Sequence, residues 1–329
     1  MTSHVRPHLL AALMVGAIAV SGVAVGVDRA AAKPTASAPL RILLTNDDGP
    51  TASGGYLTEL RDALCAAGNA VTVVVPATDQ SGNGTRITVK GTLTAAKSTF
   101  TCGSGEGTEY AVSTSIPANA SPPDAVLFGL KVLFADSPPD LVVSGMNPGA
   151  NVGRVTNHSG TVGAAVTAME QGVPAIAVSM QWNALDATRG FTGAAAARPA
   201  ANSFVVDLIK TLQRDESGHT LLSGGGLNIN WPVVYDKVGL QLVPPTGVQL
   251  TRVGSADAIT LGYTPLVGDK YAVAVGLCKL PNPCAAETRK DADTTALDNN
   301  RVSVSSLDGD WSTGVGADLS KVLREMRVG

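Results

Sequence analysis

Residues 41–50 read RILLTNDDGP, and this stretch decides the fold. The part from Arg41 to Thr45 is mostly apolar, and a short apolar run that ends in a turn predicts a buried strand. The part that follows, NDDGP, is a turn signal and contains two adjacent carboxylates, Asp47 and Asp48. A strand without polar alternation is typical of a parallel sheet that is covered by helices on both faces.

Strand and helix patterns alternate from residue 40 to about residue 231. Apolar runs predict strands at 40–45, 71–75, 141–143, 175–179 and 227–230, with short strands or a hairpin within 85–110. Helical spacing predicts helices at 55–67, 123–134, 159–171 and 194–213. This alternation predicts a three-layer α/β/α sandwich over residues 40–232, with a mostly parallel, Rossmann-like sheet and right-handed crossovers.

The pattern changes after Pro232 to short β-rich pieces that contain Pro and Gly. We therefore expect a β-rich C-terminal extension over residues 233–329, which ends in a helix near 319–326. The net charge of −3 and the aromatic content of 4% argue against a nucleic-acid groove, which needs clustered basic side chains and stacking surfaces.

The N-terminal residues have the pattern of an export signal. Arg6 precedes an uncharged apolar run from Leu9 to Val27, and the small residues 30–32 follow Arg29. We expect a signal peptide over residues 1–32, a linker over 33–39, and a secreted or cell-envelope protein with no membrane segment in its mature form. The alternative is an uncleaved membrane anchor, since the apolar run approaches the length that spans a bilayer.

The four cysteines predict two disulfides, because an even count in an exported chain is typical of disulfide bonding. Cys278 and Cys284 frame a short loop and form the expected local pair. This leaves Cys65 to pair with Cys102. Metal ligation by these cysteines is the weaker alternative, since no C-x-x-C spacing or neighbouring histidine accompanies them.

Three loops that follow predicted strands carry polar side chains, and ligands of open α/β sheets bind at such loops. In the first loop, Asp47 and Asp48 repel each other unless a cation lies beside them, and Mg²⁺, Mn²⁺ and Ca²⁺ prefer carboxylate oxygens. The alternative is a turn with solvated acids. The second loop, residues 79–84, offers the hydroxyl of Ser81 as a further oxygen ligand, or is simply a flexible loop.

The third loop follows the strand at 141–143. Asn147 comes just after this strand, on the side where we expect Asp47. Ser159, Gly160 and Thr161 open the next helix, and the free N–H groups of a helix N-terminus bind phosphate. The alternative for Ser159 is an ordinary helix N-cap. Together the three loops predict a site that hydrolyses phosphate esters, with a metal that polarises the phosphoryl group.

Three motifs stand out in the sequence: RILLTNDDG at 41–49, PDLVVSGMNPGANVG at 139–153 and HSGTVGAA at 158–165. They resemble the signatures of the SurE family of nucleotidases. The resemblance implies that Asp47, Asp48, Ser81 and Asn147 bind the metal. It also implies a phosphate pocket that is formed by Asn46, Gly82, Asn151, Ser159, Gly160 and Thr161.

Departures from the family pattern lie around the substrate rather than the metal. Ala77 and Thr78 replace charged residues, Arg154 replaces a residue that is often acidic, and His158 replaces an aromatic residue. His158 is a candidate general acid because an imidazole titrates near neutral pH. The catalytic prediction therefore comprises Asp47, Asp48, Asn147 and His158.

The expected activity is hydrolysis of nucleoside monophosphates by metal-activated water. One divalent ion is expected per subunit, Mg²⁺ or Mn²⁺, with Ca²⁺ as a candidate for the resting site. The rival functions are a broad secreted acid phosphatase that acts on other small phosphate esters, and an exported protein that binds nucleotide or metal without turnover. The family's C-terminal arms exchange between subunits, so the resemblance also implies a homodimer or homotetramer.

Overall fold

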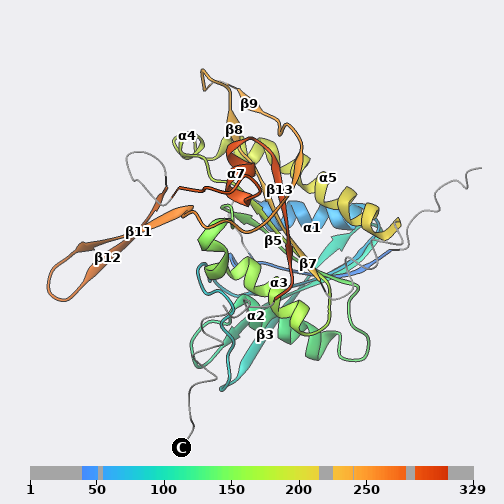
Figure 1. Ribbon diagram of the computed structural model, residues 1–329. Coiled ribbons are helices and arrows are strands. Elements are labelled where there is room, and N and C mark those ends of the chain that lie inside the picture. The colour runs from blue at the N-terminus through green and yellow to red at the C-terminus, as the bar shows by residue number, and fades with distance from the viewer. Residues whose placement is uncertain (1–38, 51–54, 215–224, 240, 279–285, 310–329) are drawn as a thin grey trace, which may run out of the picture. The chain divides into compact units, whose positions relative to one another are not determined.

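The computed structural model describes residues 39–50, 55–214, 225–239, 241–278 and 286–309 (Figure 1). Its central sheet has nine strands in the order β10-β13-β7-β6-β5-β1-β2-β4-β3. The strands from β7 to β4 in this order are parallel to their neighbours, whereas β3 is antiparallel to β4 and β13 is antiparallel to β7. The sheet is therefore mostly parallel, as predicted.

The strands of this sheet match the apolar runs of the sequence. They are β1 (Arg41–Thr45), β2 (Ala70–Pro76), β3 (Leu93–Cys102), β4 (Gly105–Thr114), β5 (Leu141–Pro148), β6 (Ala175–Met180), β7 (Gly226–Trp231), β10 (Val248–Thr251) and β13 (Val302–Leu307). Residues 93–114 form a hairpin of two long strands. The residues after Pro232 add two strands, β10 and β13, to the same sheet.

Helices cover both faces of the sheet, which gives the predicted three layers (Figure 1). On one face, α1 (Tyr56–Ala66) contacts α5 (Thr192–Arg214) and packs on Ile42 and Leu44 of β1. On the other face, α2 (Pro122–Phe128) contacts α3 (Gly160–Glu170) and packs on Leu43. Because successive strand residues point to opposite faces, the run Ile42-Leu43-Leu44 supplies both cores.

The strand order reverses between β1 and β5. From β1 the chain moves through α1 to β2 on one side, whereas β5, β6 and β7 follow one another on the other side. Such a reversal is the switch point of a doubly wound sheet, where the loops at the carboxyl ends of the strands separate and leave room for a ligand.

One crossover connection is not right-handed, contrary to the prediction. The steps β5–α3–β6 and β6–α5–β7 run in the same direction along the sheet, but α3 and α5 cover opposite faces. The two crossovers therefore have opposite hands, so they cannot both be right-handed. The segment 181–191, which contains α4 (Ala184–Ala187), joins β6 to α5.

The remaining described elements are short or peripheral. A turn of π-helix (Gly129–Leu133) prolongs α2, a 3₁₀ turn (Gly153–His158) precedes α3, and α7 (Asp293–Asp298) precedes β13. Two hairpins form separate two-stranded sheets, β8 (Val234–Tyr235) with β9 (Leu242–Val243) and β11 (Ile259–Pro265) with β12 (Tyr271–Leu277).

A disulfide between Cys65 and Cys102 joins α1 to β3, which confirms that predicted pair. Cys278 is also disulfide-bonded, and its predicted partner, Cys284, lies outside the described residues. The predicted signal peptide and the predicted helix at 319–326 lie outside them as well. Among the described residues, no helix is both long enough and apolar enough to cross a membrane.

Candidate functional site

The candidate site lies at the switch point, where β1 and β5 end. These strands are parallel neighbours, with Thr45 opposite Ser144. Asp47 and Asp48 follow β1 directly, and Asn147 is at the end of β5. The predicted metal ligands from two distant parts of the sequence therefore emerge at the same edge of the sheet.

Asp47 is buried against the N-terminus of α3. Its side chain is 3% exposed, and Thr161 donates its hydroxyl proton to Oδ1 over 2.9 Å. Burial raises the pKa of Asp47 from its ordinary value, and the hydrogen bond from Thr161 opposes that shift. Gly160 permits this approach, since a Cβ on Gly160 would lie 2.8 Å from the Cβ of Asp47.

Asp48 is half-buried, and among the described residues its buried Oδ2 has no hydrogen-bond partner. Burial raises the pKa of Asp48 to about 7, and the charges of Asp47 and Asp79 add to the shift. A buried carboxylate oxygen without a partner is costly. A cation bound at this oxygen would replace the missing hydrogen bond and would offset the repulsion between the carboxylates.

The loop after β2 contacts the turn that carries the two aspartates. Gln80 donates its backbone N–H to the carbonyl oxygen of Asp47 over 2.7 Å. Asp79 accepts two hydrogen bonds from Ser81, from its N–H over 2.8 Å and its hydroxyl over 2.7 Å. Because the Ser81 hydroxyl donates its proton to Asp79, its lone pairs remain to bind a cation. Gly82, at φ 78°, turns this loop with a left-handed backbone.

Asn147 and Asn151 are positioned by different contacts. Asn147 donates its side-chain N–H to the carbonyl oxygen of Gly149 over 2.7 Å, and its side-chain oxygen Oδ1 is the atom that could bind a cation. Asn151 is buried and donates its side-chain N–H to the hydroxyl of Ser179 over 2.9 Å. Its backbone N–H bonds to Asn230 over 2.8 Å, and its carbonyl oxygen accepts from Asn228 over 2.8 Å.

The other predicted site residues have identifiable structural partners. Asn46 bridges the turn by bonding both the N–H and the carbonyl oxygen of Gly49, over 3.1 and 3.0 Å. Ser159 is the N-cap of α3 and accepts the N–H of Val162 over 3.1 Å. The side chain of His158 is exposed, while its carbonyl oxygen accepts the N–H of Gly84 over 3.1 Å.

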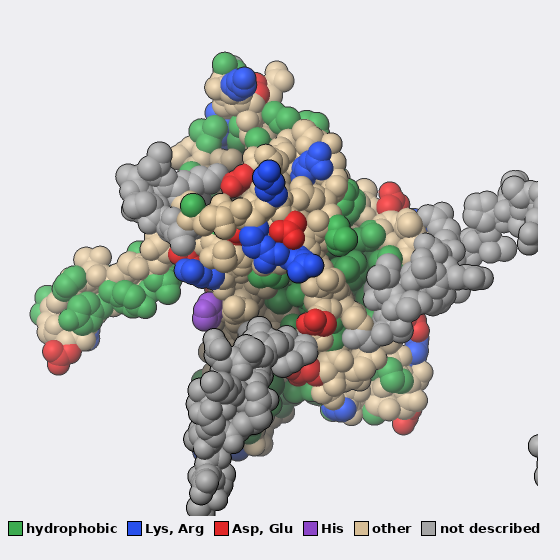
Figure 2. All heavy atoms as spheres, in the orientation of Figure 1, with side chains coloured by type: hydrophobic (Ala, Val, Ile, Leu, Met, Phe, Trp, Pro, Cys, Tyr) green, Lys and Arg blue, Asp and Glu red, His purple; other side chains and the backbone are tan. Residues whose placement is uncertain are grey.

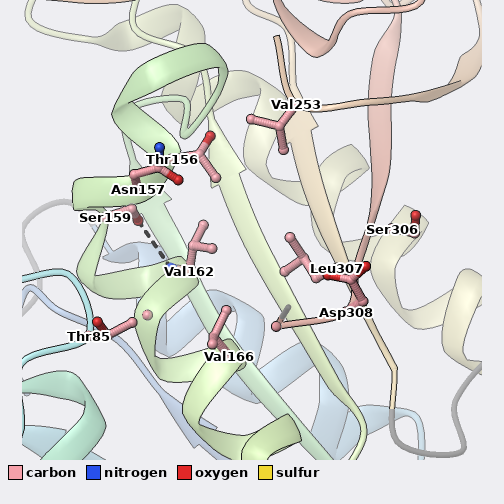
Figure 3. A pocket seen from close by; sticks show the side chains of 12 residues that line it. Thr85, Thr156, Asn157, Ser159, Val162, Val166, Val253, Ser306, Leu307 and Asp308 are labelled. Atoms are coloured by element: carbon pink, nitrogen blue, oxygen red, sulfur yellow. Dashed lines mark hydrogen bonds between the residues drawn. The ribbon is translucent and has the colours of Figure 1, made fainter. Parts of the chain in front are cut away.

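A cavity of about 190 Å³ lies beside the first turns of α3 but apart from the carboxylates. Figure 3 shows Val162 and Val166 of α3 on one side of it, and Val253 and Leu307 on the other. Among the predicted site residues only Ser159 lines the cavity. The cavity is mainly apolar, and neither Asp47 nor Asp48 lines it. We therefore place the candidate chemistry at the switch point and not in this cavity.

Several residues that support the site were not singled out by sequence reasoning. The sequence assigns no role to Asp79, which lies in the loop at residues 79–84. Asp293 is buried and accepts the N–H groups of Gly153 at 3.1 Å and Gly254 at 2.9 Å, which ties the Asn151 loop to residues near β11. Asn228 and Asn230 alternate along a buried strand, and that pattern was the available signal for an inward polar face.

The chain is an α/β/α protein with an oxygen-rich, anionic candidate site at the switch point of its sheet. The candidate site consists of the carboxylates of Asp47 and Asp48, the hydroxyl of Ser81 and the amide of Asn147. Among the described residues, no group of three His, Cys, Asp or Glu side chains is placed to hold a metal. Ligation of a cation would therefore need the neutral oxygens of Ser81 and Asn147 as well as the two aspartates.

Comparisons with known proteins agree with this class. The family described as "Survival protein SurE" matches residues 42–259, so the chain belongs to the SurE family. A protein named 5'-nucleotidase SurE from Nitrosomonas europaea is 34% identical over 272 residues, which cover 82% of this chain and 92% of that protein. A 5'-nucleotidase SurE from Methanocella arvoryzae is 39% identical over 215 residues, which cover 64% and 71% of the two chains.

A solved structure gives the same result for the fold. The crystal structure of the SurE protein from Aquifex aeolicus matches with a TM-score of 0.61 and 25% identity, over 86% of this chain and 99% of that chain. The predicted family and the predicted three-layer fold are therefore both confirmed.

Proposed function

We propose that this chain, as a phosphate monoester hydrolase of the SurE family, removes phosphate from nucleoside monophosphates with the help of one divalent metal ion. The observation that carries the proposal is the pair Asp47 and Asp48 at the switch point, with a buried Oδ2 of Asp48 that has no hydrogen-bond partner among the described residues. The names of the relatives, 5'-nucleotidase SurE, support the choice of a nucleotide as substrate.

The residues at the site fit a hard cation. Asp47, Asp48, Ser81 and Asn147 offer only oxygen ligands, which suit Mg²⁺ or Mn²⁺, and Ca²⁺ is a further candidate. When bound, such an ion polarises a phosphoryl oxygen and lowers the pKa of a water molecule. The raised pKa values of the two aspartates supply the physical reason for binding, since a cation offsets the burial of their charges.

The chain's own residues would orient the ester. Asp79 fixes the rotamer of Ser81, Thr161 fixes that of Asp47, and the turn at Asn46 sets the position of both aspartates. The N-terminus of α3 adds partial positive charge for the phosphate oxygens. The exposed side chain of His158 is free to approach the leaving oxygen as a proton donor.

The test is release of phosphate from a nucleoside monophosphate with Mg²⁺ or Mn²⁺ by wild type and by Asp47→Asn. We expect release that depends on the metal and that falls at least ~100-fold in the variant, since even residues that only support metal ligands cost roughly 10- to 100-fold. Asp136→Asn, at an exposed position after the π-helical turn, is the matched control and should behave as wild type.

The rival functions predict other results. A broad acid phosphatase would hydrolyse a simple aryl phosphate as well as the nucleotide. Folded protein that binds nucleotide or metal but releases no phosphate from any ester would refute the enzyme and favour the binding protein.

We also propose that the chain is exported. The disulfide between Cys65 and Cys102 supports this proposal, because disulfides persist in oxidising compartments. The mass of the mature protein should correspond to a chain that starts near residue 33. A full-length chain retained in the membrane fraction would favour the uncleaved anchor.

Finally, we propose that the protein is a homodimer or homotetramer joined through the hairpin of β11 and β12. Its register places Leu261, Tyr263, Tyr271, Val273 and Val275 on one face. These side chains are 53% to 64% exposed, and Figure 2 shows hydrophobic side chains along a projecting hairpin. An exposed apolar face of this kind marks a contact surface, and a second copy of the same hairpin is the occupant we propose.

A further inference from the structure

Two aromatic side chains are exposed on the segment that joins β6 to α5. Trp182 is 38% exposed and Phe191 is 36% exposed. Their ring centroids are 5.8 Å apart, with an angle of 40° between the ring planes. Neither ring is needed to fill one of the two cores, which lie on the faces of the sheet. The pair is therefore presented at the surface rather than buried.

The pair lies beside the loop that carries Asn147. Gly149 bonds through its N–H to the carbonyl oxygen of Met180, which is two residues before Trp182. A Cβ on Gly149 would lie 3.6 Å from Nδ2 of Asn147 and 3.7 Å from Cε2 of Trp182. The absence of a side chain at Gly149 therefore leaves the indole and the candidate metal ligand as neighbours.

The backbone holds this segment in an unusual conformation. Phe191 has φ 61°, in the left-handed region that bulky residues rarely adopt. Its N–H bonds to the carbonyl oxygen of Asp186 over 2.9 Å. The buried carboxylate of Asp186 accepts the hydroxyl of Tyr235 over 2.6 Å and the N–H of Gly193 over 2.7 Å. Strained residues persist where neighbours fix them, and they cluster at functional sites.

We propose that Trp182 and Phe191 form an aromatic platform that binds the nucleobase of the substrate while its phosphate lies among Asp47, Asp48 and Asn147. The inference rests on the proposed function and names the part of the site that selects nucleotides over other phosphate esters. Every nucleobase has an aromatic face, so a Trp platform gains affinity for nucleotides without choosing strongly among bases.

The alternative occupant of this exposed apolar patch is a second copy of the chain. Trp182, Leu185 and Phe191 are each only slightly more than one third exposed. Three such side chains are few for a protein interface, which buries about 800 Å² per partner and roughly 20–30 residues on each side. The contact with the Asn147 loop instead places the patch where a substrate would extend from the carboxylates.

The first experiment compares KM for a nucleoside monophosphate with KM for glycerol 2-phosphate, which has no aromatic group. In Trp182→Ala we expect KM for the nucleotide to rise about 10- to 100-fold, the range that corresponds to loss of one base-stacking contact. The values for glycerol 2-phosphate should stay within about 2-fold of wild type, and Trp182→Phe should recover most of the nucleotide affinity.

Leu185→Ala is the matched control, because it removes exposed apolar surface from the same segment but leaves both rings. It should keep the ratio of the two KM values. Equal losses for both esters in Trp182→Ala, or no change in either, would overturn the platform. A change in the molar mass of Trp182→Ala in light scattering would overturn it too, in favour of a contact between copies.

A binding measurement separates this inference from the proposed function. With Ca²⁺ present to neutralise the carboxylates, a nucleoside monophosphate should quench part of the tryptophan fluorescence of wild type, and Trp182→Phe should lose that quenching. If wild type shows the quenching but releases no phosphate from any ester with metal, the platform stands and the hydrolase fails. If wild type hydrolyses nucleotides but nucleotide causes no quenching, the platform fails and the hydrolase stands.

Discussion

The switch point and the β11–β12 hairpin use side chains in opposite ways. At the switch point polar groups are buried, with Asp47 only 3% exposed and linked to Thr161. On the hairpin apolar groups are exposed, and Val267 at its turn is 92% exposed. Both are departures from the ordinary distribution of residues between core and surface. The first needs a rigid scaffold to hold charges in place, whereas the second needs a partner surface.

The disulfide tests how far the switch point depends on its scaffold, and its loss should have the largest effect. Cys65 and Cys102 are 37 residues apart, and a loop of that length corresponds to about 4 kcal/mol of stabilisation in the chain-entropy model. The double variant Cys65→Ser with Cys102→Ser should lose about this much free energy of unfolding, as measured by urea denaturation. Because Cys65 is in α1, whose N-terminus follows the Asp48 loop, metal affinity should fall as well.

The control is the double variant Cys278→Ser with Cys284→Ser. It removes the second predicted cysteine pair, which lies in the C-terminal extension and not between α1 and β3. It should leave metal affinity unchanged. An unaltered urea midpoint and unaltered activity in the Cys65 and Cys102 variant would show that the switch point does not depend on this link.

Asp293 connects the two regions, because it bonds both Gly153 of the site loop and Gly254 near the base of the hairpin. Asp293→Ala leaves these two N–H groups and that of Thr294 without their acceptor. We expect a loss of about 3 kcal/mol in the free energy of unfolding, since each buried unpaired group costs about 1–3 kcal/mol. Urea denaturation measures this loss.

The matched control is Asp291→Ala, at an exposed position two residues earlier whose side chain forms surface ion pairs with Arg252 and Arg289. It should change stability by less than about 1 kcal/mol. Equal effects of the two substitutions would contradict the connecting role of Asp293.

Glu287 gives the hairpin base a pH dependence. Partial burial raises the pKa of Glu287. The hydrogen bonds from the backbone N–H groups of Arg289, Ser255, Ala256 and Thr288 together have the larger, opposite effect and lower the pKa to about 2. Because the folded-state pKa lies below the ordinary value of 4.5, the stabilisation is fully present above about pH 4.5 and is lost as pH falls towards about 2. At this largely solvated position we expect about 1 kcal/mol at pH 6.

The measurement is the difference in unfolding free energy between wild type and Glu287→Gln at pH 6 and pH 3. The difference should shrink at the lower pH. Glu106→Gln, at an exposed position on β4, is the control and should show no comparable change. A difference that grows as the pH falls would contradict the assigned contacts.

Substitutions on the exposed apolar face of the β11–β12 hairpin should have the smallest effect on the stability of the fold. Val273→Asp, at the position opposite Tyr263, should convert the oligomer to a smaller species in light scattering. The free energy of unfolding of the separate chain should change by less than about 0.5 kcal/mol, since surface substitutions rarely do more. Thr264→Asp lies on the other face and should leave the molar mass unchanged, so a similar shift in both variants would refute the proposed contact surface.

Sequence patterns predicted the local parts of this fold well. The run Ile42-Leu43-Leu44 is a buried strand, and residues 160–170 form the helix whose N-cap is Ser159. Residues 123–134 were predicted as one helix, and the structure continues α2 through a π-helical turn. The prediction that every crossover is right-handed is wrong for one of the two steps through α3 and α5, because neither apolar spacing nor turn residues specify which face a helix covers.

The sequence by itself determined where strands end in polar loops, and so that Asp47, Asp48 and Asn147 would meet at one edge of a parallel sheet. Tertiary structure decided which other groups join them. It brought Asp79 beside both aspartates, Asp293 to the loop of Gly153, and Trp182 to Gly149. These contacts depend on strand order and on the path of residues 181–191 from the end of β6 to α5, and local patterns of polarity do not encode either property.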